Sequence, residues 1–234
     1  MLAARRVPAA APPGIRLMSN TIAFAERYFP YIFKGTIVTI ELTVVSLLIS
    51  IVLGLIAAIA KLSGDRVASG VANVYIELIR GTPALLQLFI IYFGLTSYGV
   101  SLDSFTAAVL TLGFIGGAYL AEVFRAGIQS VDRGQVEAAV SLGMVPSAVM
   151  RRIILPQALV LTLPPFTNFV IALIKDTSLA LTIAVPEIMY RSYDVASQTF
   201  RSMEVYAMAG AIYLAVCLPL SRLVRALERR QAPR

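Results

Sequence analysis

Long apolar runs separated by short polar segments fill most of this chain. A helix that crosses a bilayer needs about 20 mostly apolar residues. Runs of about this length predict five membrane-spanning helices, at residues 35–60, 82–100, 105–124, 157–174 and 205–220. The predicted fold is therefore an all-α integral membrane protein with about five transmembrane helices.

Two of the predicted spans contain residues that interrupt a regular helix. Thr82 and Pro83 are expected to open the second span, as its cap and its first helical residue. Pro164 and Pro165 lie inside the fourth span. Proline is tolerated in a membrane helix where neighbouring helices satisfy the freed backbone groups. We therefore expect the fourth span to bend against its neighbours.

The composition excludes several classes of protein. Hydrophobic residues make up 58% of the chain and charged residues only 14%, which is too apolar for a soluble domain. The formal net charge is +7, but the basic residues are not clustered with aromatic ones, so no nucleic-acid partner is expected. The chain has no histidine, which argues against a hydrolase and against a metal site. Cys217 is the single cysteine and is expected to pack in the core.

The positions of Lys and Arg predict how the chain lies in the membrane. Segments on the cytoplasmic side of a membrane protein carry an excess of basic residues. One side of this chain has Lys175, Arg191 and Arg201, offset by acidic neighbours. The other side holds 12 basic residues, Lys61, Arg66, Arg80, Arg125, Arg133, Arg151, Arg152, Arg222, Arg225, Arg229, Arg230 and Arg234. We therefore expect an external N-terminus and a cytoplasmic C-terminus.

The two ends of the chain are expected to lie outside the membrane domain. Residues 1–17 are rich in Ala, Pro and Arg, and are expected either to be disordered or to precede the true start of translation at Met18. Residues 18–34 mix aromatic and charged side chains, which is typical of an interfacial segment. The transmembrane domain is expected at 35–225 and a basic cytoplasmic tail at 226–234.

The polar loop at residues 125–156 has a pattern of helix, stop and helix. Glu137 places a negative charge near the start of a short predicted helix, where the helix dipole favours it. The two alanines that follow allow another surface to approach the backbone closely. Gly143 fits a left-handed stop, and Pro146 is suited to open a second helix. The loop is therefore expected to form a rigid projection on the cytoplasmic side.

This loop resembles the EAA motif of permease subunits of ABC importers. In that family the motif forms a coupling helix that docks into a separate ATP-binding subunit. The resemblance implies a transmembrane domain like that of type I ABC importers. One departure is Val145, where the family often has a Ser or Thr cap. The residues that carry the resemblance, and that are expected to form the ATPase-coupling loop, are Glu137, Ala138, Ala139, Gly143, Leu155 and Pro156.

Three further stretches resemble the subfamily of polar amino acid permeases. They are RGTP at 80–83, GAYLAEVFRAGIQSV at 117–131 and NFVIALIKDTSLA at 168–180, and the likeness extends over residues 28–222. It implies a permease of the bacterial inner membrane that forms a path for a polar or charged amino acid by alternating access. The implied partners are an ABC ATP-binding subunit, a second permease chain that is identical or homologous, and an extracytoplasmic amino-acid-binding protein.

The chain has no phosphate-binding loop of the GxxxxGK[ST] type. It is therefore not expected to be an enzyme or to bind a cofactor itself. The resemblance implies that ATP and magnesium bind to the partner ATPase subunit.

Polar residues inside predicted spans are candidates for the substrate path, because ionisable groups in a bilayer are costly. A free amino acid is a zwitterion, so its path needs acceptors for the ammonium and donors for the carboxylate. For Glu41 a structural hydrogen bond between helices is an equal alternative, and Glu122 is expected to pair with Arg125. The candidate path or gate residues are Glu41, Asn168, Lys175, Asp176, Thr177 and Ser178.

Two other functions remain open at this point. A secondary transporter driven by an ion gradient commonly contains internal repeats, and no repeat is visible in this sequence. A membrane scaffold without a path would not need the polar cluster after the fourth span. Arg80 is expected to be structural, with a role in a cytoplasmic gate as the alternative.

Overall fold

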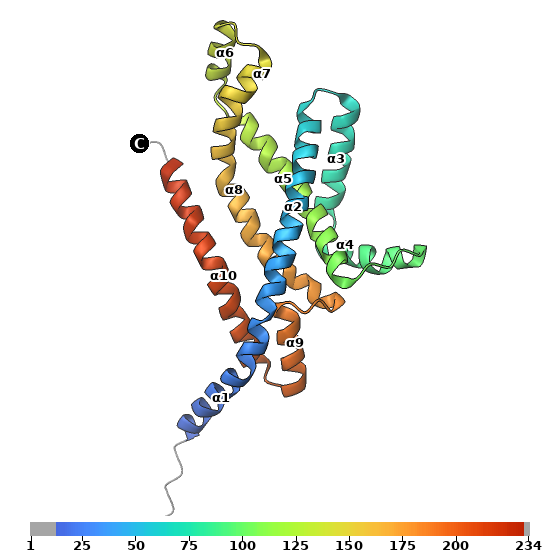
Figure 1. Cartoon of the computed structure of the whole chain (residues 1–234), viewed down its shortest axis with the longest axis vertical. Helices are drawn as coiled ribbons and strands as arrows, with labels where there is room; N and C mark the ends of the chain where they lie inside the picture. Colours follow the sequence, from blue (N-terminus) through green and yellow to red (C-terminus); the bar gives the residue numbers. More distant parts are fainter. Residues whose placement is uncertain (1–12, 232–234) are drawn as a thin grey trace, which may run out of the picture.

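The computed structural model describes residues 13–231, and this part of the chain is built from helices and connecting turns (Figure 1). Residues 1–17 were expected to be disordered or to precede the true start at Met18, and residues 1–12 of this segment lie outside the described residues. Residues 13–17 are included in helix α1 (Pro13–Phe33). At the other end, α10 (Ser202–Gln231) continues through most of the expected basic tail.

Four predicted spans are confirmed as helices that are long and apolar enough to cross a membrane. They are α2 (Gly35–Leu62), α5 (Ser104–Gln129), α8 (Leu155–Asp176) and α10. Helix α2 has 28 residues, which corresponds to about 42 Å at the rise of an α-helix. Helix α5 packs against α2 and α8 and forms the centre of the domain.

The close packing of α2 on α5 depends on small residues. A Cβ atom added to Gly113 would lie 2.7 Å from the Ile49 side chain, and one added to Gly117 would lie 2.7 Å from Leu53. Contacts this short leave no room for a side chain, so the two helices approach closely only because these positions are glycine.

The second predicted span is wrong as a single helix beginning at Thr82. The chain instead forms α3 (Arg66–Gly81), turns, and continues as α4 (Ala84–Phe89), a π-helical turn at Ile90–Gly94 and a 3₁₀ turn at Leu95–Tyr98. The two halves meet at an angle of 105°.

The physical reason is the Thr82–Pro83 pair. A residue before proline is disfavoured in the helical region, and Thr82 is extended, with φ −120° and ψ 147°. Thr82 is therefore the C-cap of α3 and not the N-cap of the following helix. The described residues contain four spans, or five if the bent pair counts as one.

Two groups of short helices lie at opposite ends of the molecule (Figure 1). Helices α6 (Arg133–Ser141) and α7 (Pro146–Val149) lie at one end. Helix α9 (Ile188–Thr199), which the sequence did not predict, lies at the other end with α1. A separate hydrophobic cluster joins α1, α9 and α10, and includes Ile32, Ile188 and Val205.

Candidate functional site

The turn between α6 and α7 is closed by a glycine in the left-handed conformation. Gly143 has φ +77°. Its N–H donates to the Val140 carbonyl at 2.9 Å, and the Met144 N–H donates to the Ala139 carbonyl at 3.1 Å. This pair of hydrogen bonds is a Schellman motif, which satisfies carbonyls at the end of α6. The predicted helix, stop and helix are therefore confirmed.

The alanines of this turn do not share one exposed face. Ala139 is buried, whereas Glu137 and Ala138 are exposed. Apolar residues lie on either side of this glycine in the chain, and their side chains are exposed: Leu142 by 84% and Val145 by 61%. The α6–α7 turn therefore ends in an apolar surface that no described residue covers.

A π-helical turn joins α7 to the long helix α8. It spans Met150–Ile154 and stands directly before Leu155 and Pro156, both of which are exposed. Proline cannot donate the hydrogen bond of a regular helix, and its ring crowds the carbonyl four residues earlier. The wider π turn accommodates Pro156 without ending the helix, which runs from Pro146 to Ile183.

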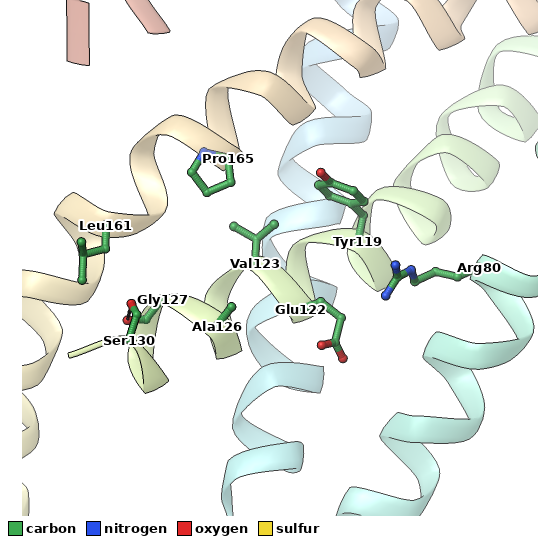
Figure 2. A pocket seen from close by; sticks show the side chains of 9 residues that line it. All are labelled: Arg80, Tyr119, Glu122, Val123, Ala126, Gly127, Ser130, Leu161 and Pro165. Carbon is green, nitrogen blue, oxygen red and sulfur yellow. Dashed lines mark hydrogen bonds between the residues drawn. The ribbon is translucent and has the colours of Figure 1, made fainter. Parts of the chain in front are cut away.

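A hollow of about 390 Å³ lies between α3, α5 and α8 (Figure 2). Figure 2 shows Arg80 reaching from the end of α3 toward Tyr119 and Glu122 of α5, with Leu161 and Pro165 of α8 on the opposite wall. The wall thus combines charged, aromatic and apolar groups from three helices.

Glu122 is held by two cations. Its carboxylate accepts from Lys61 Nζ at 2.6 Å and from Arg125 Nη2 at 2.7 Å. The pairing with Arg125 is the predicted one, whereas the link to Lys61 connects α5 to the end of α2 and was not predicted. Arg80 makes no hydrogen bond or ion pair with other residues in the described range, so its guanidinium is free to bind a ligand.

Three predicted path residues lie on α8, C-terminal to Leu161 and Pro165, which are the residues of this helix that line the hollow. Asn168 is seven residues after Leu161, and Lys175 is seven residues after Asn168, which places them on one side of a helix. Asn168, Lys175 and Asp176 are all exposed. The structure therefore leaves these three side chains on the exposed surface of α8, beyond the part of the helix that lines the hollow.

The chain stays helical beyond α8, and one of the candidate path residues there turns inward. Helix α8 ends at Asp176, and the chain continues as a 3₁₀ helix at Thr177–Ile183. Thr177 is fully buried and donates to the Ile174 carbonyl at 2.7 Å, whereas Ser178 is half-buried. Thr177 therefore supports the passage from α8 into the 3₁₀ helix and does not face the open side of α8.

Glu41 lies away from this group. It is exposed on α2 and does not line the hollow. Glu41 precedes Lys61 by 20 residues, which corresponds to about 30 Å of helix and matches the thickness of the hydrocarbon core. The structure thus favours a place for Glu41 at the membrane interface over a place beside Asn168.

Glu187, which was not predicted as a functional residue, lies between the 3₁₀ helix and α9. Its side chain is fully buried and accepts hydrogen bonds from the N–H groups of Met189 and Tyr190 and from the Tyr213 hydroxyl at 2.9 Å. Burial raises the pKa of this carboxyl above its ordinary value. Glutamate is not among the preferred N-cap residues, so this role could not be predicted from the residue type.

No cluster of three potential metal ligands occurs among residues 13–231.

Known proteins similar to this chain are membrane components of transport systems. Residues 50–233 match the family described as "Binding-protein-dependent transport system inner membrane component". The chain is 39% identical to the L-cystine transport system permease protein TcyB of Bacillus subtilis, with 88% of each chain covered. It is 39% identical to the glutamine transport system permease protein GlnP of Escherichia coli, covering 86% of this chain and 93% of that one. The arginine transport system permease protein ArtQ of Bacillus subtilis is 37% identical, with 86% and 92% covered.

Solved structures agree with these relatives. The structure described as "an amino acid ABC transporter with histidines" matches with a TM-score of 0.85 at 39% identity, covering 89% of this chain and 97% of that one. An inward-facing methionine ABC transporter, MetNI, matches with a TM-score of 0.66 at 19% identity, covering 84% of this chain and 96% of that one, which shows a shared fold.

Proposed function

Because this chain belongs to the family of binding-protein-dependent transport system inner membrane components, we propose that it is the membrane-spanning permease subunit of an ATP-driven importer of polar or charged amino acids. The fold expected for such a subunit is confirmed by the TM-score of 0.85 to an amino acid ABC transporter. One observation carries the proposal furthest. The hollow between the spans contains the guanidinium of Arg80, which has no hydrogen-bond partner among the described residues. Relatives of the chain are named as cystine, arginine and glutamine permeases, whose substrates all carry a carboxylate that a guanidinium can bind.

The hollow and the adjoining face of α8 are the proposed substrate path. The Arg80 guanidinium offers paired donors for the carboxylate that every amino acid carries. The Asn168 amide and the Asp176 carboxylate offer acceptors for the ammonium. Glu122 is already neutralised by Lys61 and Arg125, and its role is to hold the wall of the hollow.

The α6–α7 turn is the proposed contact with the ATP-binding subunit. Its exposed apolar side chains, including Leu142 and Val145, need a partner surface that excludes water. The turn lies at the end of the molecule that holds Arg133, Arg151 and Arg152, which supports a cytoplasmic location. The C-terminus is then cytoplasmic and the N-terminus external.

The remaining partners follow from the same proposal. A second permease chain completes the wall of the path, and an external amino-acid-binding protein delivers the substrate. ATP and magnesium bind to the ATP-binding subunit, whose cycle pulls on the α6–α7 turn and alternates access to the hollow.

Uptake of radiolabelled amino acid into proteoliposomes tests the path. We expect Asn168→Ala and Asp176→Asn each to lower the uptake rate by about tenfold, because the first removes a hydrogen-bond acceptor and the second removes the negative charge that faces the substrate ammonium. Asn20→Ala in α1 is a matched control, because this exposed asparagine lies outside the path, and its uptake rate is expected to stay unchanged. Normal uptake by both path variants, at normal protein levels, would remove this face of α8 from the path.

A further inference from the structure

The bend between α3 and α4 interrupts a membrane span and leaves backbone carbonyls without helical partners. The last carbonyls of any helix lack intrahelical donors, and a bilayer offers no water to replace them. At the end of α3 these groups include the carbonyls of Leu78 and Ile79, and the carbonyl of Thr82 lies in the turn. A bend of 105° is therefore stable in a membrane only if side chains satisfy these groups.

Gln87 supplies most of these hydrogen bonds from the far side of the bend. Its Nε2 donates to the Ile79 carbonyl at 2.8 Å, to the Thr82 carbonyl at 3.1 Å and to the Thr82 hydroxyl oxygen at 2.9 Å. The Thr82 hydroxyl in turn donates to the Leu78 carbonyl at 2.9 Å. Gln87 is buried, so water does not compete for these contacts.

The residues that Gln87 holds surround Arg80 in the chain. Ile79 directly precedes Arg80, and Thr82 follows it by two residues. Both backbone contacts thus fix the turn of α3 from which the Arg80 side chain reaches into the hollow (Figure 2). If the bend opened, the guanidinium would move away from Tyr119 and Glu122 of α5.

From this geometry we propose that Gln87 is a positioning residue for transport, which sets the bend between α3 and α4 and so aims Arg80 at the substrate. The inference rests on the proposed function, because it assigns the substrate carboxylate to Arg80. Gln87 itself does not touch the hollow and acts through the backbone on either side of Arg80.

The bend can be measured without reference to transport. Spin labels at Gly70→Cys and Ser97→Cys, in a Cys217→Ser background, report the distance between the two halves of the bent pair in reconstituted protein. Both label sites are exposed. Gln87→Leu is expected to shift and broaden this distance distribution, whereas Leu86→Ala, at an exposed neighbour, leaves it unchanged. An unchanged distribution in Gln87→Leu would overturn the inference whatever the transport result.

A double-mutant cycle separates positioning from general structural support. We expect Arg80→Gln and Gln87→Leu each to lower ATP-dependent uptake by about tenfold, and the double variant to be no slower than Arg80→Gln alone. If the loss of uptake in the double variant equalled the product of the losses in the two single variants, Gln87 would act independently of Arg80, which would contradict the positioning role. If Gln87→Leu does not fold, Thr82→Val removes one acceptor of the same amide and is measured in its place.

The two experiments distinguish the failure of this inference from that of the proposed function. Normal uptake by Arg80→Gln would remove Arg80 from the substrate path, and the positioning role would fail with it. Reduced uptake by Arg80→Gln together with normal uptake by Gln87→Leu would overturn the positioning role alone.

Discussion

At the scale of single residues, Glu187 shows how this fold holds a carboxylate away from water. Its two oxygens accept from two N–H groups at the start of α9 and from the Tyr213 hydroxyl of α10. The backbone beside it packs directly on α2, because a Cβ atom on Gly35 would lie 2.7 Å from the Glu187 carbonyl carbon. Glu187 therefore joins α2, α9 and α10 at the end opposite the α6–α7 turn.

The raised pKa of Glu187 predicts a pH dependence of stability. Burial favours the protonated form in the folded state, so its contribution is fully present below the ordinary pKa of 4.5 and is lost as pH rises through the raised folded value. The loss amounts to about 1.4 kcal/mol for each unit by which folding raises the pKa. Thermal unfolding in detergent measures this effect.

Comparison with a variant isolates this group from the other carboxyls. The side chain in Glu187→Gln cannot ionise. As the pH rises above 4.5, the melting temperature of the native chain is therefore expected to fall relative to that of the variant. A difference that stays constant with pH would show that Glu187 keeps an ordinary pKa in the folded protein.

The contacts of single residues were also the hardest to predict. The pairing of Glu122 with Arg125 follows from their spacing of three residues on one helix. The contact of Glu122 with Lys61 joins residues 61 positions apart, and it depends on how α2 packs against α5. Contacts within one helix follow from the spacing of residues, whereas contacts between helices can be predicted only once the packing of the helices is known.

At the scale of elements, the lengths of the apolar runs predicted four spans correctly, because a helix with about 20 apolar residues is more stable in the bilayer than in water. Helix α3 was missed because Glu77 and Arg80 interrupt its apolar pattern. Its exposed stripe, which includes Val67 and Val74, becomes visible only once the helix is assumed. Helix α9 was missed for a similar reason, because its polar residues gave no apolar run.

The stop at the end of α6 gives a prediction for coupling. Gly143 has a positive φ and open space around its Cα, so only its backbone conformation resists a side chain. Gly143→Ala is expected to destabilise the α6–α7 turn by about 1–2 kcal/mol and to lower ATP-dependent uptake. Uptake measured alongside helix content by circular dichroism checks both parts.

Two variants serve as controls for this glycine. Gly70→Ala in α3 also meets open space but has an ordinary helical backbone, and it is expected to leave uptake unchanged. Gly143→Asn is expected to retain more activity than Gly143→Ala, because asparagine tolerates the left-handed conformation. Equal uptake by Gly143→Ala and the native chain would show that this conformation does not matter for coupling.

At the scale of the whole molecule, the two ends have different chemistry. The end with the α6–α7 turn (Figure 1) has exposed apolar side chains and basic residues, and the end with α1 and α9 also exposes apolar side chains, including Phe200 and Met203, but contains the buried carboxyl group of Glu187. The hollow and the aligned residues of α8 lie in the helices that connect these ends. This arrangement suits a subunit that receives motion at one end and changes access to a path between its helices.

Uptake into proteoliposomes that contain the purified complex of this chain and its ATP-binding subunit tests the central claim most directly. With the external binding protein present, amino acid uptake is expected when ATP and magnesium reach the ATP-binding subunit and not when an ion gradient replaces ATP. Uptake that continues with the ion gradient alone would contradict an ATP-driven permease and would favour a secondary transporter.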